Sequence, residues 1–176
     1  MCRYGGSFEN RTRLLLAIID AIKQKLGKDM IITTRLGIYD AIPYPYGWAV
    51  DKNDYTKPDL TEPKKLFALL SQRNIPMINV TIGNPYYNPH YGRPYNEPVA
   101  GLYASPENPL AGVERMIRLT GEMQRAFPQM TLVGSGFVAF SGRSALWPQP
   151  CRRGIFRQLI SSCHEFISTA AGTVYL

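Results

Sequence analysis

The stretch that decides the fold is residues 7–36, SFENRTRLLLAIIDAIKQKLGKDMIITTRL. Ser7 can cap a helix, because its hydroxyl can accept a hydrogen bond from an unpaired amide of the first turn. Apolar residues then recur at helical spacing, and Gly27 is a typical C-terminal stop. The predicted apolar stripe is Leu15, Ile18, Ile19, Ile22 and Leu26. The β-branched run 30–36 predicts a strand, and its uninterrupted apolar start indicates a parallel sheet that is covered on both faces.

The same helix–strand unit is predicted twice more along the chain. A helix that begins at Thr61 precedes a strand at 75–82, and a helix that begins at Asn108 precedes a strand at 130–133. The expected buried faces of these helices are Leu66, Phe67, Leu69 and Leu70 in the first, and Leu110, Val113, Met116, Ile117, Met123 and Phe127 in the second. Such alternation predicts an α/β fold of parallel strands with helical crossovers. Long loops follow the strands, at 37–60 and 83–106, where α/β proteins bind their ligands.

Composition narrows the class of protein. The 176 residues are 45% hydrophobic and only 19% charged, which predicts one folded domain rather than a disordered chain. No apolar run has the length of a membrane span and no secretory signal precedes Ser7, so we expect a cytoplasmic protein with no membrane partner. The net charge of +7 favours anionic ligands. Because the basic residues are scattered and no nucleic-acid motif appears, we expect no nucleic-acid partner.

Residues 4–11, YGGSFENR, allow a tight turn into the first helix. This string also resembles the signature of the old yellow enzyme family, the FMN-dependent NADH:flavin oxidoreductases. The likeness continues through a strand that ends in Arg35-Leu36 and another that ends in Gly134-Ser-Gly-Phe137. It implies that residues 1–138 form a partial (β/α)8 TIM barrel, about strands 5–7 with helices 4–6. It also implies FMN as cofactor, NAD(P)H as reductant, and hydride transfer through the flavin to an activated alkene or related small molecule.

The resemblance also implies cofactor-binding residues. It places Arg35 at the N1/O2 edge of the flavin, where a guanidinium stabilises the reduced form. The alternative is a surface arginine that pairs with Asp40. Gly134, Ser135 and Gly136 could bring backbone amides to the FMN phosphate, or form a simple turn. Gly142-Arg143 matches the Gly-Arg pair that ends the family's last barrel strand, if a deletion precedes it.

The loop at 83–95, GNPYYNPHYGRPY, is rich in tyrosine and proline. Tyr86, Tyr87 and His90 are candidate substrate residues, because rigid aromatic side chains can stack on a flat molecule. The alternative is a self-packed loop that shields the mouth of the barrel. No catalytic residue and no metal ligand is assigned.

Two departures from the family lead to an alternative function. The first four barrel strands are absent, unless a second chain supplies them, and the likeness ends after Phe137. Residues 139–176 are expected to be an irregular, atypical tail, and their rise in Arg, Ser and Cys is typical of a shifted reading frame. The alternative is therefore a truncated, non-catalytic product, or a half barrel that binds anions without turnover.

Overall fold

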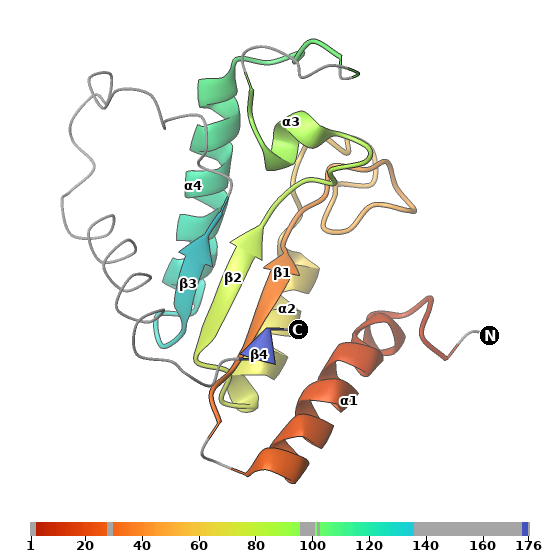
Figure 1. Cartoon of the computed structure of the whole chain (residues 1–176). Helices are drawn as coiled ribbons and strands as arrows, with labels where there is room; N and C mark the ends of the chain where they lie inside the picture. The colour runs from red at the N-terminus through yellow and green to blue at the C-terminus, as the bar shows by residue number, and fades with distance from the viewer. Residues whose placement is uncertain (1–2, 28–29, 96–100, 102, 136–173, 176) are drawn as a thin grey trace, which may run out of the picture.

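A computed structural model of the chain describes residues 3–27, 30–95, 101, 103–135 and 174–175. The predicted alternation of helices and strands is confirmed within these residues (Figure 1). The elements in chain order are α1 (Phe8–Leu26), β1 (Ile32–Gly37), α2 (Thr61–Gln72), β2 (Met77–Thr81), α3 (Pro89–Gly92), α4 (Pro109–Ala126), β3 (Thr131–Gly134) and β4 (Val174–Tyr175). The short helix α3 was not predicted, because the sequence indicated only a loop there.

The strands form one parallel sheet in the order β3-β2-β1-β4. Thr33 pairs with Met77, and Met77 pairs in turn with Thr131, so three strands share one register. The parallel pairing that we predicted is therefore confirmed. A small parallel sheet joined by helical crossovers is compatible with part of a TIM barrel, while the numbers of the barrel strands stay a prediction.

Helix α1 begins and ends where the sequence indicated. The Ser7 hydroxyl accepts a hydrogen bond from the Asn10 amide at 3.4 Å, and the Gly27 amide donates to the Lys23 carbonyl. The predicted stripe was partly wrong, because Ile18 and Leu26 are 38% and 47% exposed. Since successive residues of a helix point about 100° apart, only one of Ile18 and Ile19 can face the core, and Ile19 does.

Helix α4 is capped by Asn108, whose side chain accepts a hydrogen bond from the Leu110 amide at 2.9 Å. Leu110 was predicted to be buried and is exposed. Leu110 lies on the side of α4 that carries the exposed Glu114 and Arg118, four and eight residues later, whereas Val113 and Met116 face the core.

The core lies between the helices and one face of the sheet. Helices α2 and α4 lie behind the strands in Figure 1. Ile78, Val80 and Leu132 alternate along the strands with less buried residues and belong to the core cluster. Their buried neighbours in that cluster include, from the helices, Ile19, Leu66, Phe67, Leu70, Met116, Leu119 and Met123. This packing leaves the opposite face of β1, β2 and β3 turned away from the helices.

Much of the predicted tail lies outside the described residues. Only Val174 and Tyr175 are described there, and they pair in parallel with Ile32 and Thr33 of β1. The predictions for Gly136, Gly142 and Arg143, and for a shifted reading frame, therefore concern residues that the structure does not describe. Among the helices of the described part, none is long and apolar enough to cross a membrane.

Candidate functional site

Arg35 lies on the sheet face that turns away from the helices. It is an exposed residue of β1, two positions before the carboxyl end of the strand. In the next strand its register partner is Asn79, and one row further along Gly37 pairs with Thr81. A Cβ atom placed on Gly37 would have Thr81 Oγ1, at 3.7 Å, as its nearest neighbour. A Cβ at Gly37 would thus meet only an ordinary van der Waals contact within 4 Å.

The alternative partner of Arg35 is occupied elsewhere. The carboxylate of Asp40 accepts hydrogen bonds from the amides of Ile42 and Trp48, at 3.2 and 2.9 Å. Burial raises the pKa of the Asp40 carboxyl, and these amide contacts oppose that shift. Within the described ranges no ion pair joins Arg35 to Asp40 or to another carboxylate. Asp40 organises its own loop instead, and Arg35 keeps its charge for another partner.

The first two residues of the predicted phosphate loop lie at the end of β3. Gly134 is the last residue of the strand and pairs with Val80. The Ser135 amide and hydroxyl both donate to the Val80 carbonyl, at 3.2 and 2.9 Å. The Ser135 amide therefore extends the sheet ladder here, while Gly136 is not described. The predicted segment lies at the end of a strand, as expected. The Ser135 amide is already hydrogen-bonded to Val80, so it is not available to an anion.

The structure separates the three candidate substrate residues. Tyr86 is 97% exposed and Tyr87 is also in solvent, whereas His90 in α3 is only 7% exposed. The His90 Nδ1 lies 2.7 Å from the Tyr103 hydroxyl. Burial lowers the pKa of the His90 imidazole; the nearby Glu107 raises it and Arg115 lowers it further. The two tyrosines can meet a ligand from solvent, and His90 is part of the loop's interior.

The inner part of this loop packs on itself and on α4. The ring of Tyr91 makes edge contacts with Tyr39 and His90, at centroid distances of 5.9 and 4.8 Å. The Arg115 guanidinium lies over Tyr91 at 4.2 Å and forms an ion pair with Glu107. The self-packed alternative thus describes the buried half of the loop. The sequence did not reveal Arg115 or Tyr103, because no local pattern marks contacts between distant segments.

One buried amide joins the loops that follow β1 and β2. Asn88 donates to the carbonyls of Asp40 and Ala41, at 3.0 and 2.7 Å, and accepts from the Asn84 amide at 2.9 Å. The residue is buried, and all three contacts are to backbone groups. Asn88 therefore holds the two loops together at the carboxyl ends of neighbouring strands, where α/β proteins bind ligands.

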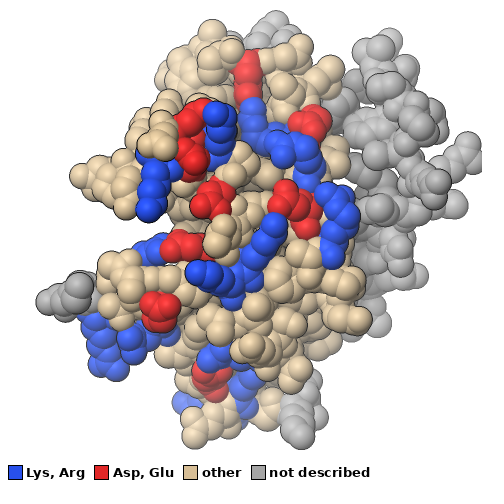
Figure 2. Space-filling view, turned by 180° about the vertical axis from the view of Figure 1, so that it is seen from behind, with Lys and Arg blue, Asp and Glu red and all other residues tan. Residues whose placement is uncertain are grey.

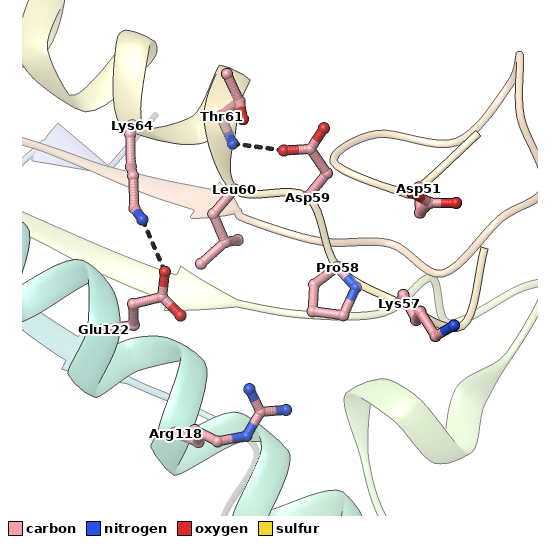
Figure 3. A pocket seen from close by; sticks show the side chains of 9 residues that line it. All are labelled: Asp51, Lys57, Pro58, Asp59, Leu60, Thr61, Lys64, Arg118 and Glu122. Carbon is pink, nitrogen blue, oxygen red and sulfur yellow. Dashed lines mark hydrogen bonds and ion pairs between the residues drawn. The ribbon is translucent and has the colours of Figure 1, made fainter. Parts of the chain in front are cut away.

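A hollow lies on the side of the helices, and the charged residues that line it are balanced in sign. Figure 2 shows that acidic and basic side chains lie next to one another over this face. In Figure 3, Lys64 of α2 and Glu122 of α4 point toward each other across the hollow, and they form an ion pair at 2.7 Å. Asp59 accepts a hydrogen bond from the Thr61 amide at 3.0 Å, and its contacts with Thr61 lower the pKa of the carboxyl. The lining residues are Asp51, Lys57, Pro58, Asp59, Leu60, Thr61, Lys64, Arg118 and Glu122. Such pairing within the hollow does not favour a charged ligand of either sign.

Comparison with known proteins relates the N-terminal third of the chain to a family. Residues 2–55 match the sequence model of the NADH:flavin oxidoreductase / NADH oxidase family. They are a fragment of that family's domain. The matched segment contains α1, β1 and Arg35, so the resemblance that residues 4–11 carry is confirmed for this part of the chain.

Neither the curated proteins nor the solved structures contain a match to the chain. Within the described residues, no group of three His, Cys, Asp or Glu side chains is placed to bind a metal ion.

Proposed function

We propose that this protein is an FMN-dependent NAD(P)H oxidoreductase of the ene-reductase type. The observation that carries the proposal is the position of Arg35. It lies in the segment that matches the flavin oxidoreductase domain, on the face of the sheet that the helices leave free. FMN would supply the hydride chemistry when it is bound, and NAD(P)H would supply the electrons.

The role proposed for Arg35 follows from the charge of a reduced flavin. A guanidinium stays protonated at all physiological pH values and donates in a planar fork, which suits an anionic ring edge. Gly37, the next residue of β1 on the same face, has no side chain that would block a flat ring beside Arg35. Arg35 would therefore bind the reduced flavin more tightly than the oxidised flavin. The loop that begins at Gly134 is our candidate for the phosphate side of the same cofactor, although the Ser135 amide and hydroxyl both donate to Val80 and an anion would need another donor.

The substrate proposed is a small molecule with an activated alkene or a related acceptor group. Tyr86 and Tyr87 are the candidates to contact it, because both are exposed on the loop that follows β2. His90 would act indirectly, since its imidazole is bound to Tyr103 within the loop.

The proposal is tested by titrating FMN into the purified chain and into three variants, with flavin fluorescence as the readout. A charge-assisted hydrogen bond contributes about 1.5–3 kcal/mol, so Arg35→Met should weaken FMN binding about tenfold or more. Arg35→Lys should retain part of the affinity, because it keeps the charge without the fork. Arg125→Met is the matched control; it removes one exposed charge from the helix side.

The reduction potential gives a second readout. Loss of Arg35 should lower the potential of bound FMN by tens of millivolts, since about 30 mV corresponds to 1.4 kcal/mol for two electrons. Wild-type protein that binds no FMN, or an Arg35→Met variant with unchanged affinity and potential, would contradict the proposal.

A further inference from the structure

Asn79 is the lateral neighbour of Arg35. The two residues are register partners in the parallel strands β1 and β2. Side chains alternate along a strand, and the residues on either side of Asn79, Ile78 and Val80, are in the core. Asn79 is partly exposed and therefore shares the free face of the sheet with Arg35. Neighbouring strands are about 4.8 Å apart, so an arginine side chain can reach the carboxamide beside it.

The surroundings of Arg35 differ from those of four arginines in or beside the helices, each of which forms an ion pair with a carboxylate. These pairs are Arg11 with Glu62, Arg73 with Asp20, Arg115 with Glu107 and Arg118 with Glu114. Arg35 has no such pair within the described part of the chain, and its neighbour in the sheet is a neutral amide.

A neutral acceptor has a specific consequence for an anion site. The carboxamide oxygen can accept one N–H of a guanidinium and so fix its plane, while the remaining donors stay available. A carboxylate at the same position would also fix the plane, but it would cancel the charge that attracts the ligand. An amide beside Arg35 can therefore orient the guanidinium without neutralising its positive charge.

We propose that Asn79 is a positioning residue for Arg35, which orients the guanidinium toward the flavin when the cofactor binds. The inference rests on the proposed function and adds a residue of β2 to the site. The two side chains are not hydrogen-bonded to each other in the free chain, so the contact belongs to the ligand-bound state. Thr81, one row further along the same face, is the next polar group that the ligand would meet.

The test is a double-mutant cycle with FMN affinity as the readout. Asn79→Leu removes the acceptor at similar volume and should weaken FMN binding about fivefold to tenfold, the range of one net hydrogen bond. In the Arg35→Met background the same substitution should have little further effect, because there is no guanidinium to orient. Met77→Leu, one row away on the same face, is the matched control and should leave FMN affinity unchanged. Equal losses in both backgrounds would overturn the inference.

Asn79→Asp tests the charge argument. It should reduce the affinity for reduced FMN more than the affinity for oxidised FMN, because the carboxylate would neutralise Arg35. A purely structural role for Asn79 would change both affinities equally, and that result would also overturn the inference.

Unfolding in urea, together with FMN binding, shows whether the inference about Asn79 has failed or the proposed function has failed. Asn79→Asp should raise the unfolding midpoint only while Arg35 is present to form an ion pair. If the wild-type chain binds no FMN, the proposed function is wrong, and so is the flavin role of Asn79. If it binds FMN but the midpoint shift, measured with saturating FMN, is the same with and without Arg35, the two side chains do not meet in the bound state, and only the inference about Asn79 is wrong.

Discussion

At the scale of single residues, we expect His90 to make the stability of the fold depend on pH. Burial lowers the pKa of its imidazole below the ordinary value of about 6.5. The unfolded chain therefore takes up this proton first as the pH falls. The contribution of His90 to stability is complete above the unfolded pKa and is lost progressively below it.

We expect the free energy of unfolding to fall as the pH is lowered below the unfolded-state pKa of about 6.5, and to fall less in His90→Gln. Urea unfolding at several pH values measures the slope for each protein. Tyr103→Phe is the control, because it removes the hydrogen bond to His90 but leaves the imidazole to titrate. Identical slopes for wild type and His90→Gln would mean that His90 is not the group responsible.

At the scale of one element, α1 is held to the core along a narrow line. Ile19 is completely buried, whereas the adjacent Ile18 is exposed. Ile19→Ala should lower the free energy of unfolding by about 2–5 kcal/mol, because it removes buried methyl groups and leaves a cavity. Ile18→Ala should cost less than about 1 kcal/mol. Chemical denaturation of both variants makes the comparison, and similar losses would show that α1 does not pack as described.

The elements were predictable because their signals are local. Ser7, Gly27 and Asn108 cap their helices as the sequence indicated, and three strands lie close to where apolar β-branched runs occur. The apolar residues alone did not show which side of each helix faces the sheet, and Ile18 and Leu110 lie away from it.

The candidate site was predictable only in part. Arg35 could be predicted as a site residue because it lies in a stretch that resembles the family and close to the end of a predicted strand. The contacts of Asn88 with residues 40 and 41, and of His90 with Tyr103, join segments that no local pattern relates. The same is true of Asn79, whose importance comes from register alone.

At the scale of the whole molecule, ion pairs connect the three long helices. Arg11–Glu62 and Arg73–Asp20 join α1 and α2, with Arg73 at the end of α2, and Lys64–Glu122 joins α2 and α4. All three pairs are partly exposed, so each should contribute only about 0.2–1 kcal/mol.

The variant that combines Asp20→Asn, Glu62→Gln and Glu122→Gln should therefore lose about 1–2 kcal/mol in total and keep its fold. Urea unfolding at low and high salt checks this, because screening should remove most of the difference between wild type and the variant. Glu114→Gln, which breaks a pair within α4, is the control. A loss of more than about 4 kcal/mol would mean that the pairs, rather than apolar packing, hold the helices together.

The parallel register has a consequence for how the chain folds. Thr33 must find Met77, and Met77 must find Thr131, with a helix and a long loop between each pair. No hairpin can start the sheet, and each strand pairing must first overcome the entropy of closing a long loop. Because the helices can form from local contacts, we expect the sheet, and with it the face that carries Arg35, to assemble late. Until then the apolar strands stay open to solvent, and this is the stage at which the chain is most prone to self-association.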